Sequence, residues 1–199
     1  MSVEAASVEI ALGLPESLRP EAVRLYWQAF GGKLGTVMGP EPQALAFLGR
    51  VMRADHVFVA LDEGRLLGIA GFKTPQGSFA GGAMADLVAV YGRFGALWRA
   101  GLLELLTREV DNERFLLDGI CVARDARSRG IGAQLLAAIE AEARLRGYGA
   151  VRLDVIGENW RARALYERQG FAVVRTDRLG LLRHVFGFGS SLTMVKALR

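Results

Sequence analysis

The residues most suited to chemistry form a run of arginines and glycines in the second half of the chain. Arg124, Arg127, Arg129, Gly130 and Gly132 lie between a predicted strand and a predicted helix. The first N–H groups of a helix have no internal partners, and that end of the helix dipole is positive. Glycines let a ligand approach the main chain, so this loop is predicted to bind an anion such as a phosphate. An ordinary strand-to-helix turn with a solvated basic rim is the alternative.

Two established phosphate motifs do not fit this loop. A dinucleotide fingerprint needs a third glycine where Leu135 stands, and the chain has no Gly-Lys-Ser/Thr for a P-loop. Metal chemistry has few ligands to draw on, because Cys121 is the single cysteine and the two histidines are His56 and His184. Zinc sites need three or four such residues at characteristic spacings. We therefore predict an activity that needs no metal ion.

A second segment, residues 158–171, carries a pattern that complements the loop. Residues 159–171 read Asn-x-x-Ala-x-x-Leu-Tyr-x-x-x-Gly-Phe, and residues 127–132 read Arg-x-x-Gly-x-Gly. In this order and spacing the two segments resemble the GNAT superfamily of acyl-CoA-dependent N-acetyltransferases. The matching part of the chain covers about residues 116–171. Ser128 stands where the family often has glycine.

The resemblance implies that acetyl-CoA is the co-substrate. Its pyrophosphate would lie on the loop amides, and its pantetheine arm would pair with strand main chain. The residues implied to contact it are Ile120, Cys121, Val122, Arg127, Ser128, Arg129, Gly130, Ile131, Gly132, Ala133, Asn159 and Tyr166. For Asn159 the alternative is a plain helix N-cap.

The resemblance also implies that Tyr166 is the general acid, which returns a proton to the departing thiolate. A core aromatic is the alternative for this residue. The attacking amine must be neutral, so a base or a chain of waters takes its proton. Asp154 is the first candidate, because it lies mid-strand and some family members that acetylate protein N-termini have an acidic residue at the matching place. Asp118, which shares strand parity with the cofactor-facing residues of its strand, is the second candidate, and His184 is a further one. For either carboxylate, pairing with an arginine or ordering a turn is the alternative.

Hydrophobic periodicity predicts the elements that position these residues. We expect strands at residues 8–12, 56–61, 65–72, 115–122, 150–156, 171–175 and 191–197. We expect helices at residues 20–30, 42–52, 83–108, 131–146 and 160–169. Gly31 and Gly32 are predicted to end the first helix, and the third is predicted to break near Gly92 or Gly95. Glu140 and Glu142 are placed on the outer face of the fourth helix, each four residues before an arginine.

This alternation predicts an α/β fold. The resemblance implies a GNAT-like fold, in which a central twisted mixed sheet is splayed between its fourth and fifth strands and has helices on both faces. With 199 residues, the chain is expected to form one domain, 1–199, with a helical insertion at about 74–114. The insertion is too apolar to lie wholly in solvent, so it extends the core, roofs the acceptor end of the site or forms a homodimer contact.

The composition of the chain argues against several classes of binding partner. The net charge is +4 and 51% of the residues are hydrophobic, as in ordinary globular proteins. Nucleic-acid binding is not expected, because no aromatic residues cluster among the arginines. A basic amino-terminal segment and an apolar stretch of about 18 residues are both missing, so no signal peptide, no membrane contact and a cytoplasmic location are expected. The predicted function is transfer of an acetyl group from acetyl-CoA to a primary amine of an unidentified acceptor. A non-catalytic acyl-CoA sensor is the alternative.

Overall fold

The computed structural model describes residues 8–106, 113–180 and 187–198. Its strands are β1 (Glu9–Leu12), β2 (Val57–Asp62), β3 (Arg65–Thr74), β4 (Gly77–Ser78), β5 (Phe115–Val122), β6 (Ala150–Ile156), β7 (Ala172–Arg178) and β8 (Ser190–Ala197). Its α-helices are α1 (Arg19–Met38), α2 (Glu41–Val51), α3 (Met84–Leu106), α4 (Ile131–Leu145) and α5 (Trp160–Arg168).

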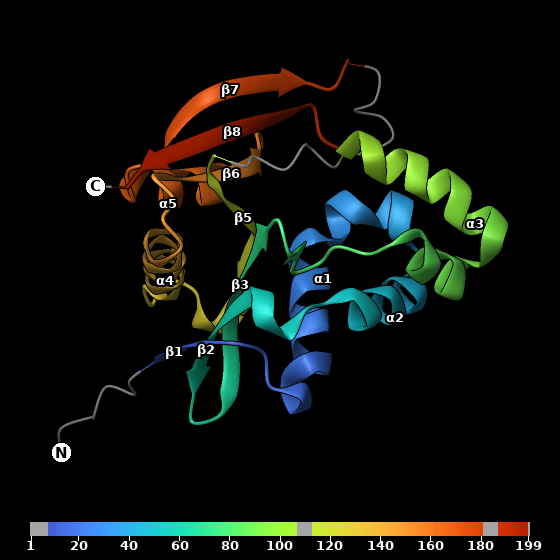
Figure 1. The fold of residues 1–199 in the computed structure, drawn as a ribbon, viewed down its shortest axis with the longest axis horizontal. Coiled ribbons are helices and arrows are strands. Elements are labelled where there is room, and N and C mark those ends of the chain that lie inside the picture. The colour runs from blue at the N-terminus through green and yellow to red at the C-terminus, as the bar shows by residue number, and fades with distance from the viewer. Residues whose placement is uncertain (1–7, 107–112, 181–186, 199) are drawn as a thin grey trace.

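The strands form one mixed sheet in the order β1-β2-β3-β5-β6-β8-β7, with β4 beside β3 (Figure 1). All neighbours are antiparallel except β5 and β6, which are parallel and joined through α4. A parallel pair needs such a crossover connection. The predicted class, an α/β fold with a central mixed sheet, is therefore confirmed.

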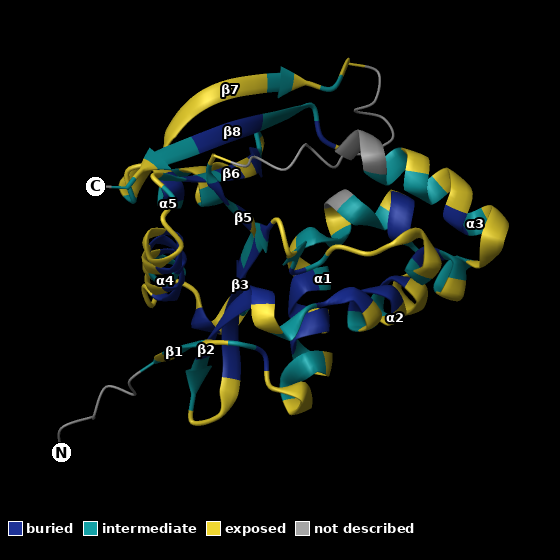
Figure 2. Cartoon of the chain, in the orientation of Figure 1, coloured by how far each residue is buried: buried dark blue, intermediate teal, exposed yellow. Residues whose placement is uncertain are grey.

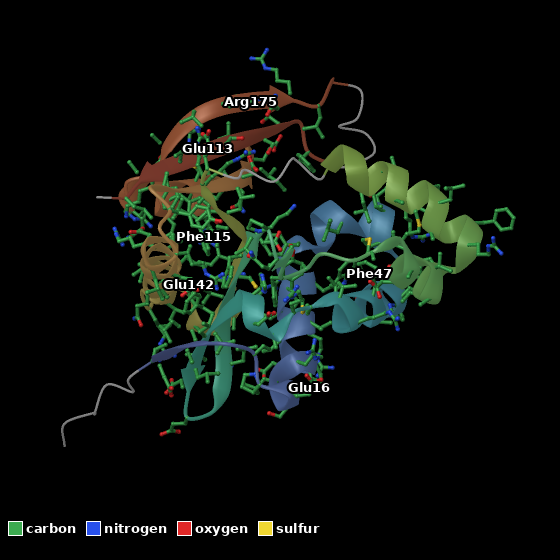
Figure 3. All side chains as sticks on the ribbon, in the orientation of Figure 1. Glu16, Phe47, Glu113, Phe115, Glu142 and Arg175 are labelled. Carbon is green, nitrogen blue, oxygen red and sulfur yellow. The ribbon has the colours of Figure 1, made fainter. Side chains whose placement is uncertain are left out.

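Helices cover both faces of the sheet. Phe58 and Ala60 of β2 pack into one apolar cluster with α4 and α5, whereas Val57 and Val59 pack into another with α1 and α2. This alternation follows from the two-residue period of a strand. Figure 2 shows burial concentrated in the central strands, whereas β7 at the edge is largely exposed. Figure 3 shows Phe115 of β5 on the α4 side and Phe47 on α2.

The first helix is longer than predicted. It passes through Gly31 and Gly32 and ends at Met38, so these glycines do not stop it. Val37 and Met38 are 0% and 3% exposed and pack in a third apolar cluster with α2 and α3. Burial of this last turn outweighs the roughly 1 kcal/mol per residue by which glycine disfavours a helix.

The acidic residues of α4 are also placed differently. Arg144 and Arg146 pair with Glu140 and Glu142 as predicted. Both glutamates are nevertheless buried, and Lys196 of β8 donates to Glu140 at 2.6 Å. The predicted outer face is therefore wrong, because β8 and the arginine side chains cover these carboxylates.

The predicted helix in the insertion is α3, and its break lies at Gly92, where φ is +69°. Leu87 and Ala96 are buried against α1 and α2, and Phe188 joins the same cluster. This packing favours extension of the core. The roof over the acceptor and the dimer contact stay predictions. Among the described residues of α3, four large hydrophobic side chains remain exposed, namely Met84, Phe94, Leu97 and Trp98. Neither α3 nor any other helix in the described ranges has the length and apolarity needed to cross a bilayer.

The buried and exposed sides of α3 allow a direct test. Leu87→Ala removes a side chain that is 5% exposed, so we expect the free energy of unfolding in urea to fall by about 2–5 kcal/mol. Phe94 is 93% exposed, and Phe94→Ala serves as the control with an expected change below about 0.5 kcal/mol. Equal effects of the two variants would contradict the core role of α3.

Candidate functional site

The candidate site begins where β5 and β6 part. The two strands pair at Phe115↔Val151, Leu116↔Arg152 and Leu117↔Leu153. Beyond these pairs β5 continues to Val122 on β3, and β6 continues to Ile156 on β8. Within the described residues the two arms no longer pair with each other, which is the predicted splay.

Strand alternation shows which main-chain groups face the parting. The Ala123 N–H donates to the Leu67 carbonyl, so residues 121 and 119 also direct their main chain toward β3. The main-chain groups of Ile120 and Val122 therefore point away from β3, toward the arm of β6. Cys121 pairs with Ile69, and its thiol is buried on the α1 side, where burial raises its pKa.

The loop predicted to bind phosphate, residues 124–130, has two residues in the left-handed conformation before α4. Gly130 is the N-cap of α4 with φ of +79°, and no side chain caps this end of the helix. Ser128 has φ of +65°, a region that favours the glycine often found there in the family. The N–H of Ala133 bonds to the Gly130 carbonyl at 3.0 Å. A Cβ on Gly130 would meet no atom within 4 Å, so the space in front of this helix end is open.

The second loop glycine has a packing role. A Cβ on Gly132 would lie 3.0 Å from Cδ2 of Leu165, so its absence lets α4 and α5 approach each other. Ile131 is 1% exposed and belongs to the core. Part of the motif thus holds the two helices together.

Ion pairs join the loop to the turn between β2 and β3. Arg129 Nη2 lies 3.1 Å from Asp62 Oδ2, and Arg65 pairs with Asp125. Arg65 also lowers the pKa of the Asp125 carboxyl. Arg127 Nε donates to the Val122 carbonyl at 3.3 Å, so this side chain reaches back over the open edge of β5.

Tyr166 lies in the core between α5 and the sheet. It is 6% exposed, and its ring centroid lies 6.0 Å from that of Phe171. Burial, and next the nearby Cys121 thiol, raise the pKa of the Tyr166 phenol above its ordinary value. The hydroxyl therefore keeps its proton at neutral pH, as a proton donor must.

Asp154 lies on the opposite face of the sheet. Its neighbours Leu153 and Val155 belong to the α4 cluster, so the Asp154 side chain points toward the side that carries α1. Thr193 Oγ1 donates to Asp154 Oδ1 at 2.5 Å, and Arg152 Nη2 lies 3.4 Å from Oδ2. The Asp154 side chain is 31% exposed.

Asp118 departs from its expected parity. The register shifts between Gly71 and Phe72, which makes Asp118 the extra residue of a β-bulge. The Asp118 side chain lies on the α1 side of the sheet. Burial of the Tyr26 phenol there raises the pKa of this group, and the charge of Asp118 raises it further. Ser78 Oγ and the Ala80 N–H donate to Asp118 Oδ2 at 2.7 and 3.2 Å. The expectation that it shares a face with Ile120 and Val122 is wrong, because the bulge turns the side chain.

Asn159 caps α5 by accepting a hydrogen bond from the Ala162 N–H at 3.2 Å. The contact of Asn159 with pantetheine stays a prediction.

His184 lies outside the described residues. His56 is buried between Asp55 and Thr74, at 2.9 and 3.0 Å from their side-chain oxygens. In the described ranges, no cluster of three or more His, Cys, Asp or Glu is placed to hold a metal ion.

The geometry agrees with comparisons of the chain with known proteins. The sequence profile of the Acetyltransferase (GNAT) family matches residues 19–171. The chain belongs to the GNAT acetyltransferase family. The predicted resemblance to acyl-CoA-dependent N-acetyltransferases is thereby confirmed at the level of the family, whose members use acetyl-CoA.

One curated relative is the mycothiol acetyltransferase of Corynebacterium urealyticum (strain ATCC 43042 / DSM 7109). It is 41% identical over 58 residues, which are 29% of this GNAT chain and 17% of the relative's length. An N-acetyltransferase from Staphylococcus aureus Mu50 has a TM-score of 0.65 at 13% identity, covering 94% of this chain and 100% of the other.

An acetyltransferase from Bacillus anthracis str. Ames, solved in complex with acetyl coenzyme A, has a TM-score of 0.51 at 14% identity. The match covers 76% of this chain and 68% of the other. At these identities the two structures establish a shared fold.

The sequence left two features of the GNAT site unpredicted. Asp62 and Arg65 anchor the phosphate loop, and the bulge redirects Asp118. The alternating run and the turn at residues 62–64 predicted the β2–β3 hairpin. No sequence signal connects this hairpin with a loop about 60 residues further on.

The left-handed conformation of Gly130 generates a stability prediction. Gly130→Ala should lower the free energy of unfolding by about 1–2 kcal/mol, because a Cβ disfavours positive φ although it meets no neighbour. Gly149→Ala is a matched control, since its Cβ also meets no atom within 4 Å and its φ is not positive. The control should be neutral or stabilise by up to about 1 kcal/mol in chemical denaturation. Similar losses in both variants would contradict the conformational argument.

Proposed function

We propose that this protein transfers an acetyl group from acetyl-CoA to a primary amine of its acceptor by direct attack. The observation that carries the proposal is the parting of β5 and β6 beside an open helix end. Main chain of Ile120 and Val122 faces the parting, and the N-terminus of α4 begins eight residues beyond Val122, at Gly130. An extended amide-bearing arm with an anionic end fits this combination.

The phosphate end of the donor would lie on the α4 helix end. Ile131 and Gly132 supply first-turn N–H groups there, and the helix dipole favours an anion. Arg127 is free to exchange its long bond to Val122 for a phosphate oxygen, because its side chain is exposed. Arg129 is partly neutralised by Asp62, so its main contribution is the position of the loop.

The proposed acid and base occupy opposite faces of the sheet at the parting. Tyr166 lies on the α4 side and Asp154 on the α1 side. The amine therefore approaches from the α1 side, where Asp154 accepts its proton. Tyr166, kept protonated by burial, donates to the departing thiolate. Holding both reactants in line supplies most of the rate enhancement, since a thioester is already reactive.

Asp118 is the weaker candidate for the base. Its Oδ2 already accepts two hydrogen bonds that anchor residues 78 and 80.

A homodimer remains a proposal connected with α3, whose Phe94, Leu97 and Trp98 are well exposed. The acceptor is a primary amine of a small molecule, a protein N-terminus or a lysine.

Acetyl-CoA binding is the first test of this function. At about one hundred times its dissociation constant, acetyl-CoA should stabilise the fold by about 2.7 kcal/mol, measured as a rise in melting temperature. Gly130→Val should abolish the rise, because its side chain enters the open space at the helix end. Gly149→Ala should keep it. An unchanged melting temperature of the wild type at saturating acetyl-CoA would overturn the proposal.

Tyr166→Phe tests the chemical step. It keeps the ring in the core and removes the hydroxyl, so turnover should fall by about 10² to 10⁴ while acetyl-CoA affinity changes little. Tyr148→Phe is the control. The ring centroid of Tyr148 lies 5.4 Å from that of Phe115 in the same cluster, and Tyr148 has no proposed role in the reaction. Assays follow thiol release across a panel of primary amines and peptides. If chemistry limits the rate and Tyr166→Phe releases thiol as fast as the wild type, Tyr166 has a purely structural role. If no acceptor gives thiol release with the wild type, the alternative of a non-catalytic acyl-CoA sensor is favoured.

A further inference from the structure

A buried hydroxyl on β8 adjoins the carboxylate of the proposed base. Thr193 and Asp154 are direct partners in the antiparallel register of β8 and β6, so their side chains share a face. The hydrogen bond from Thr193 Oγ1 to Asp154 Oδ1 is short, at 2.5 Å. We infer that Thr193 is a positioning residue for the acetyl-transfer reaction, which holds Asp154 in the orientation that accepts the amine proton. This inference rests on the proposed function.

The physical properties of Thr193 suit it to this task. It is 3% exposed, whereas the Asp154 side chain is 31% exposed. A β-branched side chain has few rotamers, so the buried Thr193 hydroxyl is a rigid donor to the partly exposed Asp154 carboxylate. Hydrogen bonds to ionised groups are shorter and stronger than neutral ones.

Asp154 also stands at the edge of the parting through its main chain. The Gly157 N–H donates to the Ser190 carbonyl, so by alternation residues 155 and 153 pair with β8. The main chain of Asp154 therefore faces the arm of β5, while its side chain is held by Thr193. This placement puts Asp154 one residue beyond the last β5–β6 pair, at the start of the parting, on the side from which the amine is proposed to approach.

Other charged groups surround this pair. Arg152 lies 3.4 Å from Asp154 on the same strand, and Arg175 of β7 is the register partner of Thr193. Arg175 is itself paired with Asp177 at 2.8 Å. All of these groups remain in a Thr193 variant, so a change in turnover on substitution reports the hydroxyl.

Loss of the hydroxyl leaves the Asp154 carboxylate free to rotate, so fewer encounters with the amine are productive. Acetyl-CoA binding is expected to stay unchanged, because Thr193 lies on β8, beyond β6 from the proposed path of the donor.

The test compares Thr193→Val, Thr193→Ser and Asp154→Asn in the full chain. With the most active amine of the panel, kcat of Thr193→Val should fall about three- to tenfold, because the hydrogen bond to the carboxylate is lost. The KM for acetyl-CoA should not change.

Matched variants separate this role from a structural one. Thr193→Ser keeps the hydroxyl and should restore kcat. Thr176→Val, the same change at an exposed position of β7, should leave kcat unaltered. If Thr193→Val does not fold, Thr193→Ala against Thr193→Ser gives the same comparison. A wild-type kcat in Thr193→Val or Thr193→Ala, while Asp154→Asn loses turnover, would overturn the inference. Full turnover by Asp154→Asn would overturn both the base and its positioning residue, while acetyl-CoA binding would still test the donor site.

Discussion

The parting of β5 and β6 is the constraint on which the rest of the structure depends. A sheet normally pairs its interior N–H and C=O groups, because an unpaired buried group costs about 1–3 kcal/mol. Here pairing stops after Leu117 and Leu153, while β3 and β8 continue to hold the outer side of each strand. Because β3 and β8 anchor the two arms independently, neither arm needs the other as a pairing partner beyond this point. Main chain of Ile120 and Val122 is then available to a ligand that pairs as a strand would.

The β-bulge at Asp118 supports this parting. It inserts an extra residue into β5 immediately after the last pair with β6, and bulges increase the local twist of a strand. Two donors from residues 78 and 80 hold the Asp118 carboxylate. A Cβ on Gly119 would lie 2.9 Å from the Phe30 ring, so glycine there lets α1 approach the strand. Asp118 is thereby better explained as an anchor of the opening than as a base.

Local patterns predicted the strands and helices well, because each is set by the periodicity of its own residues. The two motifs that contain Gly130, Asn159 and Tyr166 were recognisable for the same reason, since their spacing is local, while the roles of these residues stay predictions. Features that depend on distant partners were not. The last turn of α1 is stabilised by burial against α2 and α3, and Glu140 is covered by Lys196 of β8. In a regular strand, alternation predicts which face of the sheet a side chain lies on. The bulge moves the Asp118 side chain to the other face.

The two motifs are predictive together because they are in physical contact. Gly132 lies in the first turn of the helix that would bind phosphate, and it leaves room for Leu165 of α5. Asn159 caps α5, and Tyr166 on that helix packs against Phe171, which immediately precedes β7. A change in either segment would therefore move the other, and with it the distance between the phosphate loop and the proposed acid. Residues that fold the chain and residues that would bind the donor are largely the same here, which explains why a short pair of patterns identifies both the fold and the family.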